Sequence, residues 1–142
     1  MRLIKSAHTI YQTQYHIVIV TRFRRAWINE GVAAFLKLKL KETTQYFPDW
    51  EYVEIGTDQD HIHLHMVIPP KYAVSKVVEI IKSNTASALK QKYEFLKQVY
   101  WRGSGIWSVG YFVSTVGVDE ATIRRYVAEQ GKEDSGQTQF DW

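Results

Sequence analysis

The sequence contains no cysteine, so it has neither a disulfide framework nor a thiolate metal site. Any metal must be held by histidine, carboxylate or amide groups. The chain also lacks a run of about 18 uninterrupted apolar residues, the length that a helix needs to cross a bilayer. Its first residues, Met-Arg-Leu-Ile-Lys-Ser-Ala-His, lack the apolar segment of a signal peptide. These absences predict a cytoplasmic protein with no membrane partner.

Internal repeats and long low-complexity stretches are also missing, which argues against a repeat protein and against extensive disorder. The length of 142 residues, with 45% hydrophobic and 23% charged residues, is typical of one globular domain. We expect this domain to span residues 1–131 and a polar tail to span residues 132–142. The net charge of +3 is a mild basic bias, which is compatible with a polyanionic partner but does not require one.

Four segments have the composition of strands: residues 15–21, 50–57, 61–68 and 110–116. The second and third are joined by three residues, a linker short enough for an antiparallel hairpin. Residues 30–47 alternate in part like a strand, but their length, composition and stop at Pro48 favour a helix. Apolar residues from Val74 to Leu89 recur at helical spacing. A last helix is predicted over residues 120–130, with Asp119 as N-cap and Gly131 as C-terminal stop.

The predicted order is strand, helix, strand, strand, helix, strand, helix. This order indicates an α+β fold of the ferredoxin-like or RRM-like kind, in which an antiparallel sheet carries helices on one face. The final helix is an addition to that plan.

Three histidines alternate along the third predicted strand. His61, His63 and His65 therefore share one face of the strand, while Ile62 and Leu64 share the other. Because the apolar face must pack against helices, the histidines should lie on the open face, where two imidazoles at i and i+2 can reach one cation. The alternative is a set of polar residues that merely cover a solvated surface.

Tyr126 and Gln130 are four residues apart on the final predicted helix and should form a polar stripe with Thr122. Ile123 and Val127 should anchor the helix on another side. A helical tyrosine usually packs and exposes its hydroxyl, so this spacing alone does not establish catalysis.

Four segments, taken together, resemble the single-tyrosine HUH transposases of small insertion sequences, including the REP-associated group. HUH denotes two histidines around a bulky apolar residue. The segments follow the family's order across nearly the whole chain: Tyr15-His-Ile-Val-Ile-Val-Thr-Arg-Phe-Arg-Arg25, Asp60-His-Ile-His-Leu64, Trp107-Ser-Val-Gly-Tyr-Phe-Val-Ser-Thr-Val-Gly117 and Arg125-Tyr-Val-Ala-Glu-Gln130.

The resemblance implies a metal-dependent enzyme that cleaves single-stranded DNA and transfers the strand through a 5′-phosphotyrosine intermediate. Tyr126 would be the nucleophile, with His61, His63 and Gln130 as ligands of Mg²⁺ or Mn²⁺. The implied partners are hairpin DNA at the element's end and a second copy of the chain, in a homodimer whose active site can be shared between subunits. His65 departs from the family pattern, which usually has an apolar residue there.

Several basic and aromatic side chains are candidate DNA contacts, by pairing with phosphates or stacking on an unpaired base. Solvation or core packing is the alternative for each of them. The set is Arg22, Arg24, Arg25, Lys82, Lys90, Arg102 and Trp107, with Tyr111 as a second candidate for stacking.

Three other functions are compatible with the same residues. A domesticated HUH nuclease would cut repeated palindromes for its host with the same chemistry. A non-catalytic module would bind single strands on the open sheet, although such modules place aromatic rings where this chain has histidines. A metal-dependent hydrolase would use metal-bound water and form no covalent intermediate.

Overall fold

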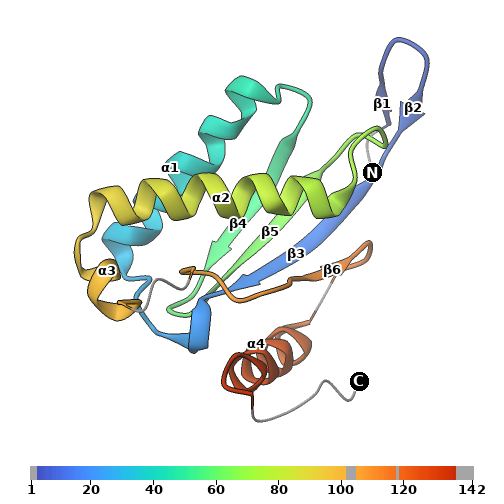
Figure 1. Cartoon of the computed structure of the whole chain (residues 1–142). Helices are drawn as coiled ribbons and strands as arrows, with labels where there is room; N and C mark the ends of the chain where they lie inside the picture. Colours follow the sequence, from blue (N-terminus) through green and yellow to red (C-terminus); the bar gives the residue numbers. More distant parts are fainter. Residues whose placement is uncertain (1–2, 102–104, 118, 137–142) are drawn as a thin grey trace.

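The computed structural model describes residues 3–101, 105–117 and 119–136, and it has the predicted α+β architecture (Figure 1). A β-α-β-β-α-β core is preceded by a small hairpin and followed by one more helix. The elements in chain order are β1 (Ile4–Lys5), β2 (Ile10–Tyr11), β3 (Gln14–Val20), the 3₁₀ turn η1 (Arg22–Arg24), α1 (Glu30–Tyr46), β4 (Glu51–Thr57), β5 (His61–Val67), α2 (Val74–Lys92), α3 (Phe95–Val99), β6 (Phe112–Ser114) and α4 (Glu120–Asp134).

The main sheet has the strand order β4-β5-β3-β6, and every neighbouring pair is antiparallel. This is the order of a ferredoxin-like fold, as the sequence predicts. β3 and β5 pair over their whole lengths, from Gln14 opposite Val67 to Val20 opposite His61. β6 pairs with only part of β3, so this edge of the sheet is short.

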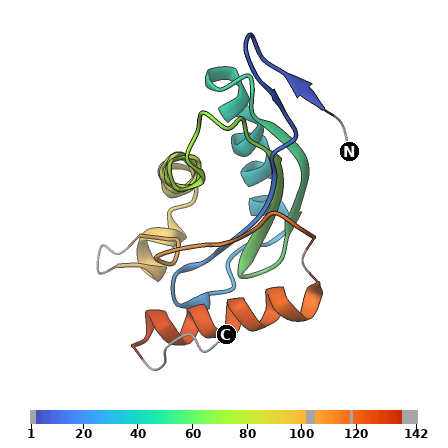
Figure 2. The same ribbon diagram turned by 90° about the vertical axis from the view of Figure 1, so that its right-hand side faces the viewer.

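The two faces of the sheet are covered differently (Figures 1 and 2). α1 and α2 pack on one face, where Ile17 and Ile19 of β3 meet Leu36 of α1 and Ile81 of α2 in the main core. α4 packs on the other face. It forms a separate small cluster there, whose buried members are Val18, Val20, Ile123, Tyr126 and Val127. Alternation along β3 sends neighbouring side chains to these two cores.

The last helix is longer than predicted. α4 begins after the predicted N-cap, since the side chain of Asp119 accepts a hydrogen bond from the Thr122 amide at 2.7 Å. It passes through Gly131 and ends at Asp134, so the expectation that Gly131 stops the helix is wrong. The stop lies at Gly136, whose φ of +70° is the left-handed conformation that favours glycine after a helix. Residues 132–134 of the predicted tail are therefore helical, and residues 137–142 lie outside the described part.

Two short elements were not predicted, because neither has a periodic apolar pattern long enough to detect. They are the β1-β2 hairpin, which projects from the sheet beside the end of β5, and α3 (Figure 1). The fourth strand is also shorter than its predicted range of 110–116. Across the described residues, no helical segment combines the length and the hydrophobicity that a bilayer span requires.

Gly131 lies where α4 meets η1. A Cβ atom added there would be 3.0 Å from the Cβ of Arg24, whereas one added at Gly31 in α1 would be 3.5 Å from the nearest atom. We predict that Gly31→Ala raises the free energy of unfolding by about 0.5 kcal/mol through helix propensity. Gly131→Ala should instead lower it by about 1 kcal/mol, because the clash outweighs the same propensity gain. Urea unfolding of both variants tests this, and a stabilised Gly131→Ala protein would contradict the close contact.

Candidate active site

The three histidines of β5 lie on the open face of the sheet, as the alternation predicts. Their side chains are partly accessible, while the alternating Ile62, Leu64 and Met66 are fully buried under the helices. His61 and His63 lie directly opposite Val20 and Val18 of β3. The histidines therefore border the small cluster that α4 covers.

Each histidine of β5 has its own hydrogen-bond partner. Nδ1 of His61 lies 2.8 Å from Oδ1 of Asp60. Nε2 of His63 lies 3.2 Å from Nδ1 of His16, and Nε2 of His65 lies 2.8 Å from Oε1 of Gln14. The ring of His16 also stacks on that of His65, with centroids 4.3 Å apart.

His16 is a residue of this site that sequence reasoning missed. It lies on β3 opposite His65, so the open face carries four imidazoles and not three. The available signal was a histidine within an otherwise apolar strand, on the same side as Val18 and Val20. Its hydrogen bond engages Nε2 of His63, so His63 must either use Nδ1 for a metal or release His16.

Burial favours neutral imidazoles at the centre of this face. Desolvation lowers the pKa of His63, and the positive charges that His61 and His65 would carry act in the same direction, although Glu54 opposes them. Desolvation also lowers the pKa of His16, with His65 and His63 adding to the effect. Neutral imidazole is the form that binds metal ions.

Tyr126 is buried in the cluster between α4 and the sheet, where only 7% of it is exposed. Its ring lies 5.6 Å from that of Phe112 on β6. Burial raises the pKa of its phenol strongly, and the negative charge of Asp134 adds to this effect. The expected separation of a polar Tyr126 stripe from the anchoring Ile123 and Val127 is wrong, because all three residues share the buried side of α4.

Gln130 is 2% exposed and points toward the loop before β6. Its Nε2 donates to the carbonyl of Val109 at 2.9 Å and to Oδ1 of Asp134 at 3.2 Å. The other oxygen of Asp134 accepts from the backbone amide of Phe23 at 2.8 Å and from the hydroxyl of Ser108. The C-terminal end of α4 is thus tied to η1 and to this loop.

The structure brings Tyr126 and Gln130 together on the side of the sheet that carries β6. Both line a cavity of about 610 Å³ between α4, η1 and β6. Its lining contains no histidine: Arg22, Val109, Gly110, Tyr111, Phe112, Tyr126, Gln130, Glu133 and Asp134. Val18 separates the two groups, since it pairs with Phe112 on one side and with His63 on the other.

The donor atoms for a metal are therefore divided between two places. Among the described residues no group of three or more histidine, cysteine, aspartate and glutamate side chains converges on one point. His61 and His63 supply two imidazoles on one face, whereas Gln130, the expected amide ligand, is on α4. The chemistry of this donor set suits a divalent cation with open coordination positions.

The proposed DNA contacts fall into different environments. Trp107 is buried, and its Nε1 donates to Thr85 Oγ1 at 3.0 Å, so its ring does not face an unpaired base. Nζ of Lys82 donates to the carbonyls of Ser108 at 2.6 Å and Gly110 at 2.8 Å.

The remaining basic candidates lie nearer the surface. Arg22 lines the Tyr126 cavity, and its buried Nε has no hydrogen-bond partner among the residues that the structure describes. Arg24 pairs with Asp60, Arg25 is exposed and Lys90 is half-buried. Arg102 lies outside the described residues.

A buried phenol with a raised pKa keeps its proton in the folded state above pH 10, where the unfolded chain loses it. The contribution of the protonated Tyr126 phenol to the free energy of unfolding is thus constant at lower pH. It is lost as the pH rises above about 10. We predict that the free energy of unfolding falls by about 1 kcal/mol more in the wild type than in Tyr126→Phe between about pH 9 and 11. Urea unfolding at both pH values tests this, and equal losses would mean that Tyr126 is accessible.

Comparisons with known proteins give the family. The model of the family described as "Transposase IS200 like" matches residues 9–130. The transposase for insertion sequence element IS200 of Salmonella typhimurium is 34% identical over 132 residues, covering 90% of this chain and 83% of that protein. The ISDra2 transposase TnpA of Deinococcus radiodurans is 27% identical over 122 residues, covering 85% and 86%.

Solved structures agree with the fold. A crystal structure described as a transposase from Deinococcus radiodurans R1 superposes with a TM-score of 0.77 at 26% identity, over 89% of this chain and 97% of that one. A REP-associated tyrosine transposase bound to a REP hairpin superposes with a TM-score of 0.54 at 14% identity, over 95% and 76%. With the family match over residues 9–130, these findings place the chain in the IS200-like family of transposases.

Proposed function

We propose that this transposase cuts and rejoins single-stranded DNA, with Tyr126 as the nucleophile and a divalent metal held by His61, His63 and Gln130. One observation carries the proposal: His61 and His63 lie two residues apart on the open face of the sheet, opposite Val20 and Val18 of the surface on which α4 docks. The transposase family supplies the context, because transposition requires DNA strands to be broken and joined.

The side chains fit a divalent cation in part. The bond between Asp60 and His61 Nδ1 leaves Nε2 of His61 as the nitrogen suited to a metal. Nε2 of Gln130 donates to Val109 and Asp134, so the amide oxygen Oε1 is the atom that would bind a metal. When bound, Mg²⁺ or Mn²⁺ would offset negative charge on a phosphate oxygen and orient the phosphorus for attack.

The proposed reaction requires two changes at the Tyr126 phenol. Its phenol must lose a proton, and its oxygen must form a bond to phosphorus while the bond to the DNA 3′-oxygen breaks. The product would be a 5′-phosphotyrosine and a free 3′-hydroxyl. A second 3′-hydroxyl can reverse the step by displacing the tyrosine oxygen, which reseals DNA without ATP. Burial raises the pKa of this phenol, so it holds its proton more tightly while α4 remains docked as described.

We also propose that the substrate is hairpin DNA near the end of the element. The fold is shared with a transposase that was solved with a REP hairpin. The exposed Arg25 and the Arg22 side chain beside the Tyr126 cavity are the basic groups best placed for phosphates.

The division of the site supports a homodimer that shares its active site. In one chain the tyrosine and the glutamine lie on the β6 side of Val18, while the histidines lie on the β5 side. If α4 docks on a second copy, its Tyr126 and Gln130 can complete the histidine pair of that copy. The alternative is a rotation of α4 within its own chain.

The covalent step can be tested with labelled single-stranded hairpin DNA from the flanks of the gene. We predict that the wild-type protein forms a DNA adduct that survives denaturing electrophoresis, only when Mn²⁺ or Mg²⁺ is present. Tyr126→Phe should form none, because it lacks the nucleophilic oxygen. Tyr46→Phe, which removes an exposed hydroxyl far from the site, should behave like the wild type.

Two other results would favour a different function. Cleavage that persists in Tyr126→Phe would indicate a hydrolase that uses metal-bound water. Binding without cleavage, in the presence of both metals, would support a recognition module.

Mixing two inactive variants tests whether the site is shared. We predict that Tyr126→Phe and the double variant His61→Ala/His63→Ala regain part of the adduct-forming activity when they are mixed and allowed to exchange subunits. The mixed dimer has one site with intact histidines and a partner tyrosine. Should size-exclusion chromatography show mixed dimers that remain inactive, the tyrosine acts within its own chain.

A further inference from the structure

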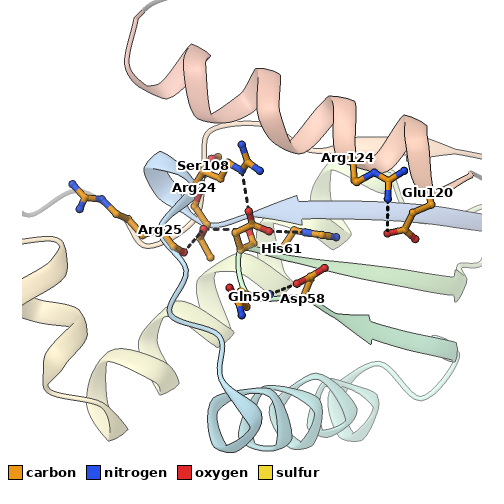
Figure 3. A network of polar contacts seen from close by, with 10 residues as sticks. Arg24, Arg25, Asp58, Gln59, His61, Ser108, Glu120 and Arg124 are labelled. Atoms are coloured by element: carbon orange, nitrogen blue, oxygen red, sulfur yellow. Dashed lines mark hydrogen bonds and ion pairs between the residues drawn. The ribbon is translucent and has the colours of Figure 1, made fainter.

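Asp60 is the residue immediately before the histidine pair, and its carboxylate contacts the side chains of His61 and Arg24, both of which are labelled in Figure 3. Oδ1 lies 2.8 Å from Nδ1 of His61. Oδ2 accepts a hydrogen bond from Nε of Arg24 at 2.9 Å. The side chains of Asp60 and His61 are 18% and 13% exposed, so this contact is mostly shielded from water.

The backbone around Asp60 is fixed as well. Its carbonyl accepts from the amide of Thr21 at 2.9 Å and from the Thr21 hydroxyl at 3.1 Å. Thr21 is fully buried at the end of β3. These backbone bonds hold the start of β5 whatever side chain residue 60 carries, so the carboxylate can be removed without removing this anchor.

The contact with Asp60 determines which nitrogen of His61 is available. A carboxylate only accepts hydrogen bonds, so Nδ1 must carry the proton. In a neutral imidazole the other nitrogen, Nε2, then has a free lone pair. A carboxylate that orients a metal-binding histidine in this way typically strengthens the site.

We propose that Asp60 is a positioning residue for the metal site: it fixes the tautomer and the ring orientation of His61 so that Nε2 faces the cation. This inference rests on the proposed function, because it requires that His61 binds a metal. Asp60 itself is not a ligand in this arrangement, since both carboxylate oxygens are engaged by His61 and Arg24.

Arg24 extends this arrangement to the helix that carries the tyrosine. α4 contacts Arg24 through Gly131, where a Cβ atom would be 3.0 Å from the Cβ of Arg24. The Arg24 side chain is 51% exposed, and exposed ion pairs contribute little to stability. The role of this pair is therefore to hold the Asp60 carboxylate in place while α4 is docked.

The experiment measures Mn²⁺ binding to the 142-residue chain without DNA, by titration with detection of free Mn²⁺ by electron paramagnetic resonance. We expect Asp60→Ala to bind Mn²⁺ about 10- to 100-fold more weakly than the wild type. Asp60→Asn should lose less of the affinity for Mn²⁺, because its amide oxygen can still accept a hydrogen bond from Nδ1 of His61. The matched control is Asp49→Ala, which removes a carboxylate paired with Lys71 at 3.0 Å, near the start of β4, and should bind as the wild type does.

A second measurement isolates positioning from a general loss of structure. Nitrogen-15 NMR of the metal-free proteins should show His61 protonated at Nδ1 in the wild type and mainly at Nε2, or mixed, in Asp60→Ala. Thermal melting identifies any variant that fails to fold, and Asp60→Asn then provides the comparison.

The outcomes separate the two proposals. Wild-type binding with equal affinity in Asp60→Ala, or an unchanged His61 tautomer, overturns the role of Asp60 and leaves the metal site intact. A wild-type protein that binds no Mn²⁺ overturns the proposed metal site, and the role of Asp60 with it.

Discussion

The register between β3 and β5 is the constraint on which the rest of the molecule depends. Seven consecutive residue pairs fix it, from Gln14 opposite Val67 to Val20 opposite His61. Side chains alternate between faces along a strand, so a shift of one residue would turn Ile62 and Leu64 to the open face and bury the histidines under α1 and α2. The cost of burying unpaired imidazoles excludes that arrangement. The same interaction therefore builds the main core and displays the histidines.

The residues at the end of β3 connect the sheet to the other segments of the site through hydrogen bonds. Thr21 bonds the start of β5 through the Asp60 carbonyl, and its own carbonyl accepts from the hydroxyl of Ser108 at 3.1 Å. Immediately after it, Phe23 and Arg24 have φ values of 58° and 56°, which are uncommon for residues with side chains. This tight turn places the Phe23 amide against Asp134 of α4. Three segments distant in sequence thus meet at one buried threonine.

The sequence predicted the sheet, both main helices and the positions of His61 and His63, because each depends on a local period. Alternation places the histidines on one face whatever the helices do. The separation of Tyr126 from these histidines was not predictable in the same way. It depends on which side of Val18 α4 docks, and helical spacing does not contain that information. The end of α4 was misjudged for a related reason, since two glycines follow the predicted helix and only the packing of Gly131 against Arg24 distinguishes them.

The environments of the basic and aromatic residues also could not be predicted from local sequence patterns. Trp107 was a candidate for stacking on an unpaired base, but its ring lies 5.5 Å from that of Trp27 in the core. Arg24 is one of three arginines between residues 22 and 25, and its bond to Asp60 depends on the fold bringing together two residues that are 36 positions apart. Charge in a sequence indicates affinity for anions in general, whereas the partner of each charge is decided by tertiary structure.

The docking surface of α4 is a second, separate core with only five buried members on this face of the sheet. The larger core under α1 and α2 shares none of them. Proteins open in units whose stability follows the apolar area and the bonds that each unit buries. A domain with two cores of such unequal size can lose the smaller one while the larger remains closed. We therefore expect α4 to be the element that detaches first, while β3, β5 and the histidines that they carry remain folded.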